Sequence, residues 1–238
     1  MMPFKIGIRE IERYEEIETE DGIELVETPE WQSYEARIKL ENKIKLANVN
    51  DIDRDYVGSD AQGNLSKLEK YTQGFTSSDP KVSYRFRTSS LYLWSRRNGT
   101  QKSTMARRLG RDLIRAGFSV HMLLMSDLSS ALTHQGFEDE DAWLLETLDA
   151  VDLLIVDDAF DPKKITLYRS GYQIPFLDTF LRRRLEANKK AICFTSNIPI
   201  DSIGDTFGPS IQSLVKRSAA PLEFTDGIDD FDIKDLWK

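Results

Sequence analysis

Cysteine and histidine are nearly absent from this chain of 238 residues. Cys193 is the single cysteine, and His121 and His134 are the two histidines. A disulfide within the chain is therefore excluded, and a structural zinc site lacks the thiolates that it needs. Cys193 lies in the apolar run of residues 191–194, which is typical of a buried thiol rather than of a nucleophile paired with histidine.

Long apolar runs are also missing. No run approaches the ~20 residues that a helix needs to cross a bilayer, and the first five residues lack the apolar segment of a secretory signal. We therefore expect a cytoplasmic protein that has no membrane partner. Hydrophobic residues still make up 40% of the chain, which is enough to build the core of one large domain, or of a medium domain with an appendage.

Positive charge is scarce at the N-terminus. The whole chain has a net charge of −8, and residues 1–36 hold eleven acidic but three basic residues, which already accounts for it. The remaining residues are balanced, with 29 of each sign. The acidity is therefore a property of an N-terminal arm rather than of the body of the protein.

Composition and turn signals divide the chain into four parts. The acidic arm ends in a predicted helix at 34–46, where apolar residues recur at a spacing of three to four. A polar linker follows, with one predicted helix at 65–75. The parts are the arm (1–46), the linker and lead-in helix (47–88), a core (89–225) and an acidic C-terminal tail (226–238).

Short apolar segments alternate with helical patterns in the core. Because parallel strands need long crossover connections, which helices supply, this alternation predicts a parallel α/β sheet. The expected strands lie at 90–94, 119–124, 151–156 and 191–195, and the expected helices at 105–114, from 127, 144–148 and 174–185.

A polar loop follows the first strand and runs into a helix, as a phosphate-binding loop does. In the pattern G-x-x-x-x-G-K-[ST], Arg96 and Gln101 take the glycine positions, whereas Lys102 and Ser103 fit. A tight loop needs glycine at such positions, so the loop alone leaves phosphate binding open. The candidate phosphate ligands are Asn98, Gly99, Thr100, Gln101, Lys102, Ser103 and Thr104.

Polar residues also end two later strands. Asp157 and Asp158 follow residues 153–156, and Asn197 follows the strand at 191–195. The first acid would hold Mg²⁺ together with Ser103, the second would polarise water, and Asn197 would bind water or the γ-phosphate. The alternative is that these strands end in solvated polar turns.

These segments together resemble the AAA+ ATPases of the DnaC/DnaI-type replicative helicase loaders, with the IstB transposition helpers as close relatives. The resemblance covers about 47–225 and lies in the order and spacing of its motifs. They are a lead-in segment at 48–56, Walker A at 98–103, residues 126–128, Walker B at 154–158, sensor 1 at 195–197, and the closing helix and strand at 207–224.

The resemblance implies a three-layer αβα P-loop sheet of the AAA+/RecA-like kind with a small N-terminal helical extension, and ATP or ADP with Mg²⁺ as cofactors. It implies a loader that binds a hexameric replicative helicase, through the arm, and delivers it to DNA. The alternatives are a degenerate AAA+ binding module without turnover and an IstB-like helper, and the arm could instead be a solubilising tail. Self-association, and a phage origin of so divergent a sequence, stay open.

The sequence also departs from the family. Both Walker A glycines are missing, Asp158 stands where the family places Glu, and Leu214 occupies the position of the arginine finger. Lys216 or Arg217 could replace the finger, or could form a solvated basic edge. We therefore expect nucleotide binding with weak or absent ATPase activity.

Basic residues cluster at three places in the core. Such patches can follow a phosphate backbone and would give weak, salt-dependent binding of single-stranded DNA, although charged helix faces are often only solvated. The clusters are Arg107, Arg108, Arg111 and Arg115; Lys163 and Lys164; and Arg182, Arg183 and Arg184 with Lys189 and Lys190.

Overall fold

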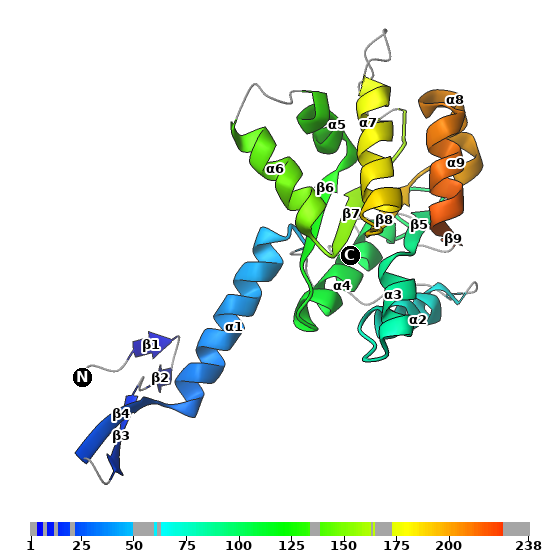
Figure 1. Cartoon of the computed structure of the whole chain (residues 1–238). Coiled ribbons are helices and arrows are strands. Elements are labelled where there is room, and N and C mark those ends of the chain that lie inside the picture. The colour runs from blue at the N-terminus through cyan, green and yellow to red at the C-terminus, as the bar shows by residue number, and fades with distance from the viewer. Residues whose placement is uncertain are drawn as a thin grey trace, which may run out of the picture. The chain divides into compact units, whose positions relative to one another are not determined.

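The structure is a computed structural model that describes residues 4–6, 9–11, 14–19, 22–49, 60, 63–133, 139–162, 164 and 173–225. The chain divides into two compact units, Met1–Leu46 and Ala47–Lys238, whose elements are labelled in Figure 1. The acidic tail at 226–238 and most of the lead-in segment at 48–56 lie outside the described residues.

The described residues of the N-terminal unit form two antiparallel hairpins and one helix. Strands β1 (Phe4–Ile6) and β2 (Arg9–Ile11) pair, as do β3 (Tyr14–Thr19) and β4 (Gly22–Glu27), and α1 spans Pro29–Leu46. The predicted helical extension is present as α1, whereas the two hairpins were not predicted. The β-branched residues of 14–27 favour strands, and they outweigh the low overall hydrophobicity of the arm.

Helix α1 begins earlier than predicted. The backbone N–H of Trp31 donates to Thr28 Oγ1 at 3.2 Å, and Pro29 occupies the first position of the helix. A threonine cap followed by proline is a recognised helix start. The predicted start at residue 34 missed this signal because it rested on apolar spacing alone.

The second unit contains a five-stranded sheet in the order β6-β7-β8-β5-β9, in which every neighbouring pair is parallel. The predicted parallel α/β sheet is therefore confirmed. Its strands are β5 (Ser90–Trp94), β6 (Val120–Leu124), β7 (Leu153–Asp157), β8 (Ala191–Ser196) and β9 (Ala219–Glu223).

Helices cover both faces of the sheet and complete three layers (Figure 1). On one face of the sheet, α4 (Lys102–Arg115) packs on the strands, and α2 (Asn64–Phe75) lies beside α4. Four helices cover the other face: α5 (Met125–Thr133), α6 (Asp139–Ala150), α7 (Gln173–Arg182) and α9 (Pro209–Ser218). The remaining elements are α3 (Pro80–Arg87), a π-helix (Arg183–Ala187), a 3-10 helix (Ile200–Ser202) and α8 (Gly204–Phe207). Within the described ranges, no helix is both long and apolar enough to span a bilayer.

Helix α3 was not predicted, although its start is signalled. Asp79 caps the helix by accepting from the backbone N–H of Lys81 at 2.8 Å, and Pro80 takes the first helical position. The helix has eight residues, which is too short for apolar periodicity to reveal it.

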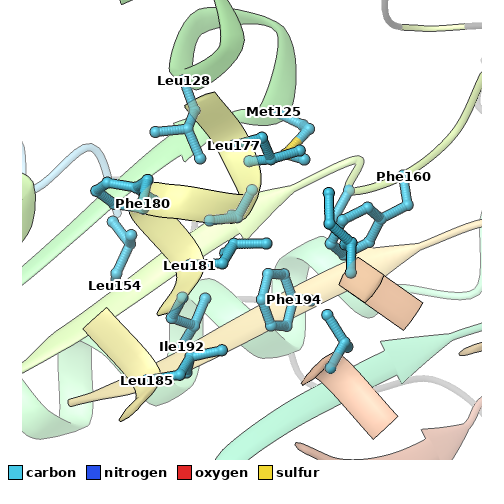
Figure 2. Close-up of a cluster of buried hydrophobic side chains, with 14 of the residues drawn as sticks. Met125, Leu128, Leu154, Phe160, Leu177, Phe180, Leu181, Leu185, Ile192 and Phe194 are labelled. Carbon is cyan, nitrogen blue, oxygen red and sulfur yellow. The ribbon is translucent and has the colours of Figure 1, made fainter. Parts of the chain in front are cut away.

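The core lies between the sheet and α7 (Figure 2). Leu154 and Phe194 of the strands pack with Leu177 and Leu181 of the helix, and all four are buried. Burying a side chain of this size stabilises the fold by about 1.5–3 kcal/mol. This packing fixes β7 and β8, the two strands that end in the polar residues of the candidate site.

Arg184 is a fully buried arginine at the edge of this core. Its guanidinium donates to the carbonyls of Leu148, Val151 and Ala191, and burial lowers its pKa to about 10, so it stays charged at neutral pH. The sequence placed Arg184 in a surface cluster for DNA, which was wrong. Successive residues of a helix point in different directions, so a run of three arginines in the sequence does not by itself show that all three are exposed.

Candidate nucleotide-binding site

Strands β5, β7 and β8 bring their polar ends to one edge of the sheet. Because the strands are parallel, their carboxyl ends coincide, and this is where open α/β sheets bind ligands. The backbone N–H of Ser95, just after β5, donates to the carbonyl of Ser196 at 3.1 Å. The candidate loop therefore starts beside the end of β8.

The backbone at position 101 adopts the conformation that glycine favours, although the residue there is glutamine. Gln101 has φ of +61°, in the left-handed region, and α4 begins at the next residue. Gly99 also has a positive φ, of +75°. A side chain in this region costs roughly 1–2 kcal/mol, so the loop retains its shape at the expense of local strain.

Lys102 lies inside this loop rather than in solvent. Its side chain is buried, and Nζ donates to the carbonyl of Arg97 at 3.2 Å and to Thr100 Oγ1 at 3.1 Å. Burial lowers the pKa of Lys102, while the nearby Asp158 and Asp157 oppose that shift. A bound anion would favour the charged form of this lysine.

The other loop residues surround Lys102 with different exposure. Asn98 and Gly99 are exposed at the tip, and Thr100 is buried beneath it. Ser103 and Thr104 lie half-buried in the first turn of α4, where backbone N–H groups lack partners in the helix. A helix start of this kind, with a lysine beside it, can hold phosphate oxygens.

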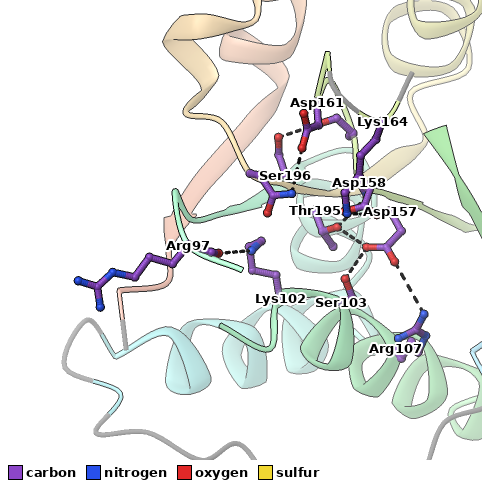
Figure 3. Close-up of polar contacts among 12 residues, drawn as sticks. Arg97, Lys102, Ser103, Arg107, Asp157, Asp158, Asp161, Lys164, Thr195 and Ser196 are labelled. Carbon is purple, nitrogen blue, oxygen red and sulfur yellow. Dashed lines mark hydrogen bonds and ion pairs between the residues drawn. The ribbon is translucent and has the colours of Figure 1, made fainter. Parts of the chain in front are cut away.

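Asp157 is the centre of the polar contacts (Figure 3). Its Oδ1 accepts from Ser103 Oγ at 2.6 Å and from Thr195 Oγ1, and its Oδ2 lies 3.8 Å from Nη2 of Arg107. The structure thus brings together Ser103 and Asp157, which were predicted to share a metal ion. It adds Thr195, which the resemblance placed in sensor 1 without a stated role, and Arg107, which was assigned to a basic cluster for DNA.

The second acid is engaged by a lysine. Asp158 Oδ2 accepts from Lys164 Nζ at 2.7 Å, and the backbone N–H of Asp158 donates to Thr195 Oγ1 at 3.1 Å. Asp158 also has a positive φ, of +53°. The side chain predicted to polarise water is therefore held in an ion pair with its own chain, in a strained turn.

Asn197 lies at the end of β8, as predicted, but its side chain donates to Asp161 Oδ2 at 3.1 Å. Asp161 is buried and belongs to the turn that follows β7. A contact of Asn197 with a phosphate or water stays a prediction. Neither Asp161 nor Lys164 was predicted as a site residue, because the pairing depends on how the turn folds.

The region predicted to supply a finger has one internal residue, Leu214, and two exposed ones, Lys216 and Arg217. Leu214 lies on the buried face of α9 and is fully buried in the core, so it has a packing role. Lys216 donates to Asp201 Oδ1 at 2.6 Å, and Arg217 pairs with Glu186. Within this chain, both basic candidates for the finger therefore have acidic partners.

The basic clusters are likewise less open than the sequence indicated. Arg111 is buried in α4, and Arg115 pairs with Asp112 at 3.3 Å. Arg182 pairs with Asp178 and Glu186, and Arg183 pairs with Asp149. The reading of these runs as continuous surface patches was therefore wrong for Arg111 and Arg184, whose side chains are internal. Lys163 lies outside the described residues.

The residues present fit a nucleotide with a divalent cation. A hydroxyl and a carboxylate in contact, Ser103 and Asp157, are the hard oxygen ligands that Mg²⁺ prefers. Among the described residues no group of three or more His, Cys, Asp or Glu side chains could hold a metal by itself. An ion here would complete its coordination with phosphate and water, as Mg²⁺ commonly does.

Solved structures provide the comparison with known proteins. No protein-family description and no curated sequence matches the chain. The DnaC helicase loader structure has a TM-score of 0.59 at 16% identity, with 77% of this chain and 99% of that chain covered. The DnaI structure has a TM-score of 0.56 at 17% identity, with 78% of this chain and 94% of that chain covered.

AMPPCP-bound DnaA from Aquifex aeolicus has a TM-score of 0.57 at 14% identity, with 75% of this chain and 51% of that chain covered. The resemblance that the motifs indicated is thus confirmed at the level of the fold. The chain shares its α/β fold with the solved structures of the DnaC helicase loader, of DnaI and of DnaA.

Proposed function

We propose that this protein binds ATP or ADP, with Mg²⁺, at residues 98–104. The observation that carries the proposal is the buried Lys102 at the start of α4, next to Ser103, which contacts Asp157. Lys102 would neutralise phosphate charge, and the first N–H groups of α4 would hold phosphate oxygens. Ser103 and Asp157 would hold the cation.

The test is calorimetric titration of ADP with Mg²⁺ into the full-length protein and into Lys102→Ala. Lys81→Ala is the matched control, because Lys81 is an exposed lysine on α3. Binding that Lys102→Ala abolishes and Lys81→Ala retains supports the site. Equal heats from all three proteins would place the nucleotide elsewhere.

The role that we propose is that of a helicase loader in DNA replication. The protein would bind a hexameric replicative helicase and deliver it to DNA. In support, the chain covers nearly all of the solved DnaC and DnaI structures but about half of the DnaA structure. The extent of the match therefore favours the loaders over the initiator.

The N-terminal unit is the proposed helicase-docking part. Ile17, Ile23 and Leu25 of the β3–β4 hairpin are exposed, at 42%, 68% and 53%, and none of the residues of α1, all of which are described, is buried. Ile23 and Leu25 lie on one face of the hairpin and Ile17 on the other, and the acidic hairpin's face with Ile23 and Leu25 suits a partner surface with an apolar centre and a basic rim. Such a contact would weaken with salt.

Removal of residues 1–46 tests this docking, with nucleotide binding measured side by side as the control for folding. Loss of helicase capture with unchanged ADP affinity supports docking through the arm. Retention of full helicase affinity would move the interface to the core. Capture of a transposase in place of the helicase would favour the IstB-like alternative.

A second candidate is a binding module with an AAA+ fold but without turnover. The Asp158–Lys164 ion pair favours it, since the acid that would polarise water is already engaged. Steady-state hydrolysis with the Asp157→Ala variant as the blank separates the two candidates. Weak single-strand DNA binding, self-association, a cytoplasmic location and a phage origin remain predictions.

A further inference from the structure

Arg107 places a positive charge beside the carboxylate that would hold the cation of the nucleotide. Its Nη2 lies 3.8 Å from Asp157 Oδ2, and the side chains of Arg107 and Asp157 are 30% and 7% exposed. Ser103, one turn earlier on α4, donates to the other oxygen of the same carboxylate at 2.6 Å. Residues four apart share one helix face, so α4 presents a hydroxyl and a cation to Asp157 together.

The backbone around Arg107 is held close to the sheet. A Cβ added at Gly110 would lie 2.9 Å from Val49 Cγ1 and 3.0 Å from Ile155 Cδ1. Helix α4 therefore packs tightly against β7, the strand that ends at Asp157, and only glycine fits at this contact. The position of Arg107 relative to Asp157 follows from this packing rather than from a loose surface helix.

The charges of the site balance without a metal. Lys102, Arg107 and Lys164 supply three positive charges, and Asp157, Asp158 and Asp161 supply three negative ones (Figure 3). Without Arg107 the same group of side chains would carry one net negative charge. An anionic phosphate would then be repelled unless a divalent cation bound with it.

We propose that Arg107 is a built-in counter-cation for Asp157, so that nucleotide binds to this site without a strict requirement for Mg²⁺. The inference rests on the proposed nucleotide site. It assigns to Arg107 a positioning and charge-compensating role, with Mg²⁺ competing with Arg107 for Asp157. Removal of the arginine charge makes nucleotide binding depend on the divalent ion.

The test is calorimetric titration of ADP into the full-length protein, once with Mg²⁺ and once with EDTA. For the wild type we expect affinities within about threefold of each other. For Arg107→Gln we expect an EDTA affinity lower by about tenfold or more, because Asp157 is then uncompensated. Arg107→Lys keeps the charge and should restore most of the wild-type affinity in EDTA.

Arg108→Gln is the matched control, since Arg108 is the next residue of α4 and lines a small hollow with Leu65 and Leu68 of α2. It should behave as the wild type, and thermal unfolding of each variant reports on folding. Equal sensitivity of wild type and Arg107→Gln to EDTA would overturn the role of Arg107. No ADP binding by the wild type even with Mg²⁺ would overturn the proposed function, and this inference with it.

Discussion

Replacing Gln101 with glycine should stabilise the protein, because Gln101 adopts a backbone conformation that suits glycine. With φ of +61°, its Cβ costs roughly 1–2 kcal/mol. Glycine loses more backbone entropy on folding, by roughly 0.5–1 kcal/mol. The difference predicts a gain of up to about 1.5 kcal/mol, which raises the melting temperature by up to about 6 °C for a protein of this size.

The assay is chemical unfolding of the nucleotide-free protein, followed by ADP titration. Gln101→Gly should also bind ADP more tightly, because the Cβ next to the phosphate position is removed. Lys189→Gly is the matched control: Lys189 also has a positive φ, of +50°, but lies outside the candidate site. It should gain stability without a change in ADP affinity. A loss of stability in Gln101→Gly would refute the reasoning and show that side-chain contacts of Gln101 outweigh the strain.

Three further substitutions test other parts of the structure. Arg184→Met should destabilise the fold by about 3 kcal/mol or more, since three buried carbonyls lose their donor; a urea midpoint equal to that of the wild type would contradict this. Burial lowers the pKa of His121 in the folded protein. The neutral imidazole therefore contributes its full stability above the ordinary pKa of about 6.5, and this contribution is lost as the pH falls below that value toward the lowered pKa. The unfolding free energy of His121→Gln should therefore fall less than that of the wild type between neutral and mildly acidic pH, and parallel curves would exclude the effect. Lys164→Ala frees Asp158 from its ion pair and should raise any measurable hydrolysis, while ADP affinity measured with Mg²⁺ changes little; an unchanged rate would mean that Asp158 is not limiting.

The sequence was sufficient for four of the five strands and their parallel arrangement, and it placed Ser103 and Asp157 at the same edge of the sheet, where the structure shows them in contact. Buried parallel strands leave continuous apolar runs, and their polar ends coincide by topology, so residues 54 positions apart could be placed together. The hairpins of the arm were missed because β1 and β2 have three residues each, too few for a periodic signal, and because three of the six residues of β3 are Glu. Helix α1 was recognised by its spacing, although its capped start was not.

The partners of the charged residues could not be predicted. Whether Arg107 faces Asp157, or Lys164 faces Asp158, depends on side-chain distances set by packing and by a turn with positive φ at Asp158 and Phe160. Arg184 illustrates the same limit, because Arg183 just before it is exposed while Arg184 donates to buried carbonyls. A run of charged residues in a sequence does not show which of its side chains are exposed, because the fold decides that.

A structure of the protein with ADP bound would test the central claim most directly. The account predicts the β-phosphate at the start of α4, with Lys102 Nζ on a phosphate oxygen in place of its present contacts with Arg97 and Thr100. Ser103 should lie at the same phosphate, next to Asp157. ADP bound away from residues 98–104, or Lys102 unchanged in its contacts while ADP is bound, would contradict the account.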